Sequence, residues 1–114
     1  METINIMVLR HAAFYSPLIT CISGGFLKQE GLEATYTVAT PENTVADGIN
    51  NNTVDVAQSA VATSFMLLEQ SNKPGYAHFA QINQRDGFFL TSRSRQENFQ
   101  WSDLKDKKVL VDHF

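Results

Sequence analysis

The chain has 114 residues, of which 9 are basic and 12 acidic, so its formal net charge is −3 with neutral histidines. This length suits one compact domain, and a hydrophobic content of 43% supplies enough apolar side chains for a core. The acidic balance gives no electrostatic support for a nucleic-acid partner. The single cysteine, Cys21, excludes an intramolecular disulfide and a zinc site built from several cysteines. No apolar run approaches the roughly 18 residues of a membrane span, and no signal-peptide pattern opens the sequence.

The first part of the chain alternates between predicted strands and helices. Residues 4–9 form a short apolar run typical of a buried strand. Ser16 and Pro17 then match an N-cap followed by proline at the first helical position. Apolar residues at helical spacing lead to Gly31, which is placed to end that helix in a left-handed conformation. Residues 32–38 alternate apolar and polar side chains, which is typical of a strand at a sheet edge.

Shorter elements continue this alternation. Thr40 and Pro41 repeat the cap-and-proline signal before a short amphipathic helix. Residues 53–57 predict a third strand, and Ser59 is placed to cap the helix that follows. The remaining expected elements are that helix, with Val61, Phe65 and Leu68 on its apolar face, strands at 76–82, 88–91 and 108–111, an exposed polar segment at 94–100 and a single turn at 102–104.

This order of elements predicts the fold class. Alternating strands and helices are typical of an α/β protein with a doubly wound, mainly parallel sheet and helices on both faces. We expect the first strand to be central and residues 32–38 to lie at an edge. Ligands of such sheets bind beyond the carboxyl ends of the strands. The segments to consider for binding are therefore 10–16, 39–41, 58–59 and 83–86.

Four stretches carry a further signal. They read GFLKQEGLE at 25–33, GINNNTVDVA at 48–57, DGFFL at 86–90 and DLKDKKV at 103–109. In this order and with these gaps, they resemble the substrate-binding proteins of nitrate-, sulfonate- and taurine-type ABC importers, a family that includes binders of thiamine pyrimidine precursors. The resemblance extends over residues 4–112. Asp106 stands where that family usually has glycine.

The resemblance implies a periplasmic-binding-protein type II fold, in which two lobes close over a ligand. Residues 1–92 would form the N-terminal ligand-binding lobe, and residues 93–114 the crossover and the first strand of a second lobe that is truncated here. The implied ligand is a small anion, such as a sulfonate or nitrate, or a thiamine pyrimidine precursor. The implied partner is the membrane permease of an ABC importer, without direct membrane insertion of this chain. The implied location is periplasmic or membrane-anchored and extracellular, while a cytoplasmic one stays open because no signal peptide is present.

Ten residues make up the expected ligand site. After the first strand, an arginine, an imidazole and an aromatic pair precede a helix N-terminus, which suits an anion with an organic body. An amide and a hydroxyl precede another helix, whereas Glu42 would repel an anion from the loop at Thr40. The alternatives are aromatic core packing, plain helix capping by the serines, and a solvated turn or lobe hinge at 83–86. The ten residues are Arg10, His11, Phe14, Tyr15, Ser16, Thr40, Gln58, Ser59, Asn83 and Arg85.

Other chemistry finds little support in the sequence. The histidines and Cys21 lack metal-ligand spacing, and His78 is expected in a sheet because it alternates with its neighbours. Ser59 lacks the surroundings of a nucleophile elbow, and Gly24-Gly25 lacks phosphate-loop spacing, so we interpret it as close helix packing. Family enzymes that make a thiamine pyrimidine carry a cysteine-rich motif that is absent here, so we expect neither catalysis nor a cofactor. An enzyme on the same scaffold and a single-lobe regulatory domain remain the alternatives.

Overall fold

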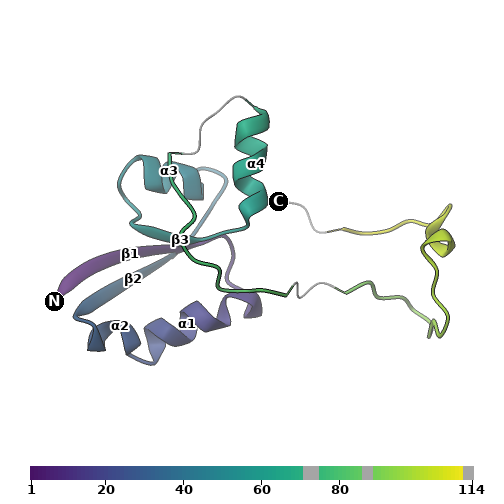
Figure 1. Ribbon diagram of the computed structural model, residues 1–114, viewed down its shortest axis with the longest axis horizontal. Coiled ribbons are helices and arrows are strands. Elements are labelled where there is room, and N and C mark those ends of the chain that lie inside the picture. The colour runs from purple at the N-terminus through teal and green to yellow at the C-terminus, as the bar shows by residue number, and fades with distance from the viewer. Residues whose placement is uncertain (71–74, 86–88, 112–114) are drawn as a thin grey trace.

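A parallel three-stranded sheet forms the centre of the molecule. The computed structural model describes residues 1–70, 75–85 and 89–111 (Figure 1). Strands β1 (Glu2–Val8), β2 (Leu32–Val38) and β3 (Val56–Gln58) lie in the order β2-β1-β3, and β1 pairs in parallel with both neighbours. The predictions that the first strand is central and that the alternating strand lies at an edge are therefore confirmed.

Helices cover both faces of this sheet, as predicted. Figure 1 shows α1 and α2 on one side and α3 and α4 on the other. The chain runs from β1 through α1 and α2 to β2, and α3 then carries it back past β1 to β3. Right-handed crossovers place helices on opposite faces when the direction of travel along a sheet reverses. The helices are η1 (Ala13–Tyr15), α1 (Ser16–Ser23), α2 (Phe26–Gln29), α3 (Val45–Asn50), α4 (Val61–Glu69) and η2 (Trp101–Leu104).

The core lies between α3 and the sheet. Met7, Val45 and Val54 are buried together there, with Ile49 among the partly buried residues packed against them. Gly48 lets the helix approach closely, since a Cβ at this position would lie 2.7 Å from Val54 Cγ2. This contact joins the glycine and the valine of the stretch at 48–57, so that sequence signal marks the packing of α3 on the sheet.

The first predicted helix divides into two. Gly25 adopts a φ of 75°, and this left-handed residue separates α1 from α2. The close packing expected of Gly24-Gly25 holds for Gly24 alone: a Cβ there would lie 2.7 Å from Phe26 Cε2, whereas nothing lies within 4 Å of the same position at Gly25. Gly31 has a φ of 80° after α2, as predicted. The N-cap is Tyr15 rather than Ser16, whose hydroxyl donates to the carbonyl oxygen of Ala13 at 2.6 Å.

Two other predicted caps are wrong. Helix α3 begins after Thr44, not after Thr40, because Thr44 and Asp47 form a capping box. Thr40 instead pairs with Asn43 in an isolated antiparallel bridge. Helix α4 follows Ala60 without a side-chain cap, so Ser59 does not cap it. For α3, the threonine and aspartate three residues apart, Thr44 and Asp47, were a stronger signal than the proline after Thr40. For α4, a serine before an apolar run was too weak a signal to predict a cap.

The later predicted strands are also wrong. Residues 76–82, 89–91 and 108–111 contain no strand, while residue 88 lies outside the described part. A strand needs a neighbouring strand to pair its backbone groups. Among the described residues the sheet ends at β3, which itself pairs with β1 over only three residues. The third strand itself begins at Val56 rather than at residue 53. The single turn near 102–104 is confirmed as η2.

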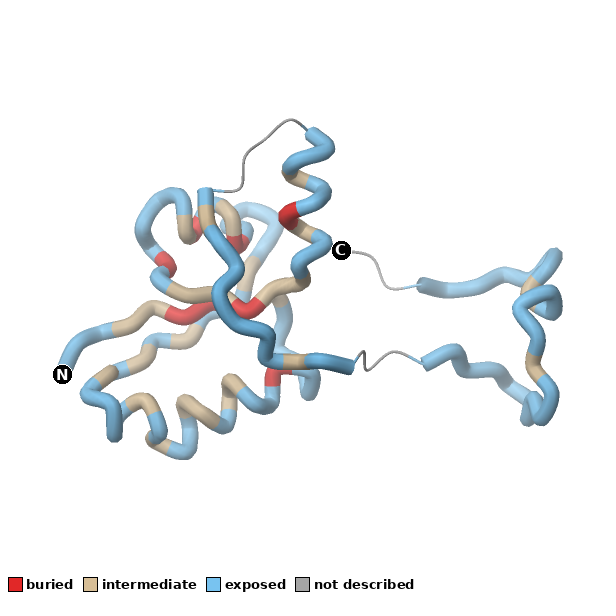
Figure 2. Tube along the Cα trace, in the orientation of Figure 1, coloured by how far each residue is buried: buried red, intermediate tan, exposed pale blue. Residues whose placement is uncertain are grey.

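Residues 89–111 extend away from the sheet and are largely exposed (Figures 1 and 2). The radius of gyration is 17.9 Å, against about 13 Å for a compact domain of this length. Leu110 is fully exposed, and Phe65 on the expected apolar face of α4 is 63% exposed. That face, with Val61 and Leu68, is therefore not buried among the described residues. Asp106 has a φ of 60°, which explains why glycine would suit that position.

Candidate functional site

The carboxyl ends of β1 and β3 lie side by side where the sheet reverses direction. The backbone N–H of Leu9, just after β1, donates to the carbonyl oxygen of Gln58 at the end of β3, with a distance of 3.3 Å. Arg10 and His11 follow on one strand and Ser59 on the other. Four of the expected site residues are therefore brought to one edge of the sheet, at the position where open α/β sheets bind ligands.

The aromatic pair after β1 divides between the interior and the surface. Tyr15 is only 6% exposed, and Phe14, which remains accessible, meets it edge-on with ring centroids 5.4 Å apart. Burial raises the pKa of the Tyr15 phenol, while the charge of Arg10 and a hydrogen bond from its backbone act in the opposite direction. Tyr15 thus offers a neutral phenol that anchors the segment, and Phe14 offers a ring face to a ligand.

Tyr36 also lies at this edge of the sheet, beside His11, although its sequence context predicted only a place in the strand at 32–38. Its hydroxyl lies 2.9 Å from Nδ1 of His11, and the two rings meet edge-on at 5.8 Å. Tyr36 pairs with Ile6 in the parallel register, so it points to the same face as that residue. A tyrosine among the apolar positions of an edge strand was the signal that could have identified it.

Asn83 contacts the loop after β1, although it lies far from that loop in the sequence. Its Nδ2 donates to the carbonyl oxygen of Phe14 at 3.0 Å, across 69 positions of the chain. This contact brings the predicted segment 83–86 to the segment after β1. Arg85 is exposed, and position 86 lies outside the described residues.

Thr40 lies on the opposite side of the β1 end from Ser59. It follows β2, which neighbours β1 at this edge, since the backbone N–H of Ala39 donates to the carbonyl oxygen of Val8 at 2.8 Å. Because β1 lies between β2 and β3, Thr40 is two strand spacings, about 10 Å, from the end of β3. Its hydroxyl accepts a hydrogen bond from the backbone N–H of Asn43 at 3.2 Å. Thr40 therefore closes a local turn, with the exposed Glu42 inside it.

Two buried amide oxygens lie among the expected site residues. For Gln58 Oε1 and Asn83 Oδ1, the described part of the chain supplies no hydrogen-bond donor. Leaving such an acceptor without a donor costs about 1–3 kcal/mol, so a structure keeps it only with a compensating role or partner.

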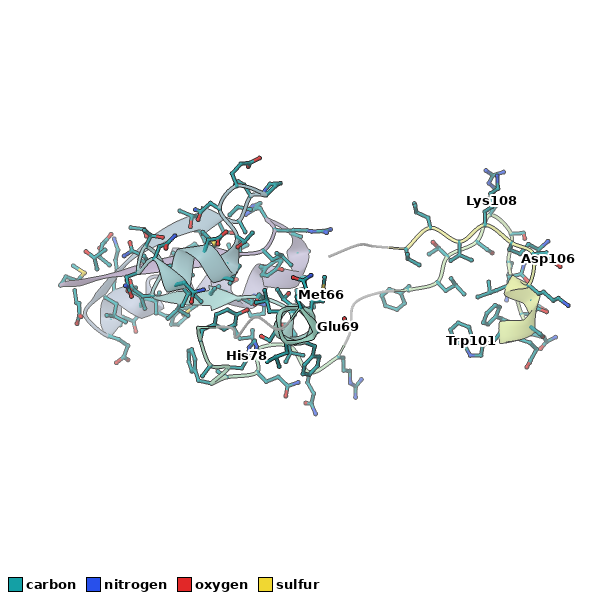
Figure 3. The ribbon with its side chains drawn as sticks, turned by 90° about the horizontal axis from the view of Figure 1, so that it is seen from above. Met66, Glu69, His78, Trp101, Asp106 and Lys108 are labelled. Atoms are coloured by element: carbon teal, nitrogen blue, oxygen red, sulfur yellow. The ribbon has the colours of Figure 1, made fainter. Side chains whose placement is uncertain are left out.

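His78 lies beside α4 rather than in a sheet, contrary to our expectation (Figure 3). Its Nε2 lies 2.8 Å from the hydroxyl of the buried Ser64, and Tyr76 meets the histidine ring edge-on. These contacts attach the segment after α4 back onto that helix. They make His78 a structural residue of this segment.

A separate pocket of about 340 Å³ lies near the amino end of β2, between that strand and helices α1 and α2. Lys28 and Glu33 line it and form an ion pair at 3.4 Å. Because it lies toward the opposite end of the strand from the segments described above, it is distinct from the expected site.

Two further properties concern only the described residues. None of their helices is long and apolar enough to cross a membrane. Their histidines, cysteine and carboxylates form no group of three or more that could hold a metal ion.

Comparison with known proteins gives one informative similarity. No family model matches the chain, and no solved structure matches it significantly. A Bacillus subtilis (strain 168) protein named "Putative binding protein YtlA" is 33% identical over 110 residues, which is 96% of this chain. The chain spans about a third of the length of that relative. Over nearly its whole length, the chain is therefore similar to part of a binding protein.

Proposed function

We propose that this chain forms the N-terminal lobe of a solute-binding protein, in which residues 1–92 bind a small polar molecule and a second lobe closes over it. The protein would deliver that solute to the membrane permease of an ABC importer. It would work outside the cytoplasmic membrane, either in the periplasm or attached to the cell surface. Residues 93–114 would lead into the second lobe.

The observation that carries this proposal is the convergence at the reversal point of the sheet. The segment after β1, the end of β3 and Asn83 are joined there through Leu9 and Phe14. Open α/β sheets bind their ligands at this position. The similarity to a protein named as a binding protein, whose length is about three times that of the matched region, supports the same interpretation.

The side chains at this edge suit a small ligand with an acidic group and a flat or alkyl body. Arg10 supplies positive charge, and the accessible ring of Phe14 can contact an apolar part. Nitrate, a sulfonate or a thiamine pyrimidine precursor are therefore the first ligands to examine. Both lobes of such a protein contribute contacts, so closure buries most of the ligand surface.

A variant in the loop after β3 tests this site. Ser59→Phe places a bulky ring at the carboxyl edge without removing a hydrogen bond that the described residues make. We expect it to abolish binding of the best ligand of the panel while the melting temperature stays within a few degrees of the wild type. Val61→Phe on the exposed face of α4 is the matched control and should bind normally. Unchanged affinity in Ser59→Phe would contradict the proposed site.

The absence of catalysis needs its own test. The bound ligand is recovered after prolonged incubation with the protein and analysed by mass spectrometry. We expect the ligand to return chemically unchanged, because a transport protein has to release what it captured. Accumulation of a product would favour an enzyme on the same scaffold.

A further inference from the structure

Residues 89–111, which we call the arm, expose apolar side chains. Leu110 is fully exposed, and Phe89, Trp101 and Val111 are also largely exposed. The arm runs outward from the sheet and turns at η2, so the helices of the sheet do not cover it (Figure 1). Uncovered apolar residues that gather on one segment mark a site of interaction.

Helix α4 carries a second uncovered apolar surface. Val61, Phe65 and Leu68 follow one another at helical spacing, and each is more than half exposed. We call these three residues the α4 face. The buried residue of this helix is instead Ser64, whose hydroxyl contacts His78. A helix that packs only on its own sheet turns its apolar stripe inward, so the α4 face is oriented to pack against something outside the sheet.

The charges of the arm and of the folded part are opposite in sign. The arm has five basic and three acidic side chains, whereas residues 1–70 have two basic and seven acidic ones. Among the described residues, Lys105, Lys107 and Lys108 of the arm form no ion pair, and neither does Glu69 at the end of α4. The arm and the surface around the α4 face are therefore complementary both in apolar character and in charge, and charge complementarity orients two docking surfaces.

The accessible surface of the chain shows how much area is left uncovered. It is 9354 Å² for a mass of 12.8 kDa, against about 6,300 Å² for a compact protein of this mass. The excess is about 3,000 Å² per copy, and each partner of a standard stable complex buries only about 800 Å². The uncovered area is therefore large enough for a stable dimer.

Within one copy the arm and the α4 face lie apart. Figure 3 shows Met66 and Glu69 on α4 well separated from Trp101 and Lys108 on the arm. The longest dimension of the molecule is 55 Å, and the arm forms one end of it (Figure 1). Neither surface therefore covers the other in a single copy.

The chain that leads to the arm is attached to the folded part at two points. His78 contacts Ser64 of α4, and Asn83 donates to the carbonyl oxygen of Phe14. Folding the arm back onto its own α4 face would require a sharp bend after these contacts. Exchange of arms between two copies keeps both contacts and the extended course of the arm. Two copies related by a twofold axis cover both arms and both α4 faces at once, so a second copy is the partner that fits.

We propose that the chain forms a dimer in which the arm of each copy packs on the α4 face of the other. Trp101 and Leu110 then contact the apolar side chains around Phe65, and the lysines of the arm lie near Glu69. This inference goes beyond the proposed function, which concerns the carboxyl ends of β1 and β3. Failure of one leaves the other standing, because the two are measured separately, by oligomeric state and by ligand binding.

The oligomeric state of the 114-residue chain tests the exchange of arms. By sedimentation velocity, we expect a mass near twice 12.8 kDa above about 10 µM, falling toward that of one copy on dilution. High salt should weaken the dimer, because it screens exposed charges such as those of the lysines and Glu69. A wild-type chain that stays monomeric at about 1 mM would overturn the inference.

Substitutions on the two surfaces identify the contact. Phe65→Gln on the α4 face and Leu110→Gln on the arm should each raise the dissociation constant of the dimer about thirtyfold or more. Both side chains are exposed, so the circular dichroism spectra should stay unchanged. Phe26→Gln on α2 is the matched control, because this phenylalanine is similarly exposed but lies on the opposite face of the sheet. A dimer that survives both test substitutions would overturn the inference.

Mixing the two variants separates exchange between copies from every other arrangement. Phe65→Gln keeps an intact arm and Leu110→Gln an intact α4 face, so a mixed pair can form one of the two contacts. We expect energy transfer between differently labelled variants at concentrations where neither variant associates alone. A mixture without association would show that the arm and the α4 face do not meet between copies, and it would overturn the inference.

Discussion

Asp55 fixes the register in which β3 joins the sheet, so Asp55→Ala should destabilise the fold. Its Oδ2 accepts from the backbone N–H of Asn5 at 2.7 Å and from Nδ2 of Asn5 at 3.0 Å. The backbone N–H of Asp55 donates to the carbonyl oxygen of Asn5 at 2.9 Å. Thr35 extends this ladder from β2 by donating to Asn5 Oδ1 at 2.9 Å. One side chain of the central strand thereby connects all three strands.

The magnitude follows from the two carboxylate contacts. A hydrogen bond to a charged group contributes about 1.5–3 kcal/mol, but Asp55 is exposed, and solvent screens much of that contribution. We therefore expect Asp55→Ala to lower the free energy of unfolding by about 1–2 kcal/mol in total. The melting temperature should fall by roughly 4–8 °C for each kcal/mol lost. Asp55→Asn keeps one acceptor oxygen and should lose less.

Urea unfolding followed by circular dichroism measures this loss. Glu42→Ala removes an exposed acid that forms no hydrogen bond or ion pair within the described part of the chain, and it serves as the control. A free energy for Asp55→Ala equal to that of Glu42→Ala would refute the reasoning. Because Asp55 immediately precedes β3 and Gln58 is the last residue of that strand, the side-chain amide signal of Gln58 should also move in the NMR spectrum of Asp55→Ala.

Three further predictions concern packing and protonation. Gly48→Ala should lower the free energy of unfolding by about 1 kcal/mol, because the cost of overpacking against Val54 Cγ2 exceeds the gain in helix propensity. In a Val54→Ala background Gly48→Ala should instead raise the free energy of unfolding, and a rise in the wild-type background would contradict the overpacking argument. Hydrogen bonds from Thr44 lower the pKa of Asp47 below 3.8, so its contribution is present above about pH 4 and lost below it, and the stability difference between wild type and Asp47→Asn should narrow in acid. Burial raises the pKa of Tyr15 above 10.0, so wild-type stability should fall as the pH rises above about 10, and Tyr15→Phe should flatten that fall; parallel curves would show that Tyr15 is not responsible.

The parallel sheet was predictable because the sequences of its strands have the patterns expected for their positions. The apolar run of β1 and the alternation of β2 reflect their central and edge positions. The strands expected at 76–82 and 108–111 show the limit of this reasoning. An apolar run indicates only that burying its side chains is favourable. It does not indicate whether a neighbouring strand is present to pair with its backbone groups.

The candidate site was predictable only in outline. The rule that ligands bind beyond the carboxyl ends of parallel strands identified the segment at Arg10 and the end of β3. In the structure Asn83 lies beside Phe14 of that segment. The rule could not reveal that Tyr36 contacts His11, since that contact depends on the parallel register of β1 and β2. Nor could it show that Thr40 lies beside the end of β1 but two strands away from the end of β3, because strand order decides which ends are neighbours.

Mapping the ligand contacts by NMR tests the central claim most directly. The ¹⁵N-labelled chain is titrated with taurine and with 4-aminopyrimidine, and every backbone and side-chain amide shift is recorded. Our account predicts that the largest changes occur at residues 9–16, at Gln58 and Ser59, and at Asn83. Changes centred instead on residues 22–34, around the pocket beside β2, would contradict it.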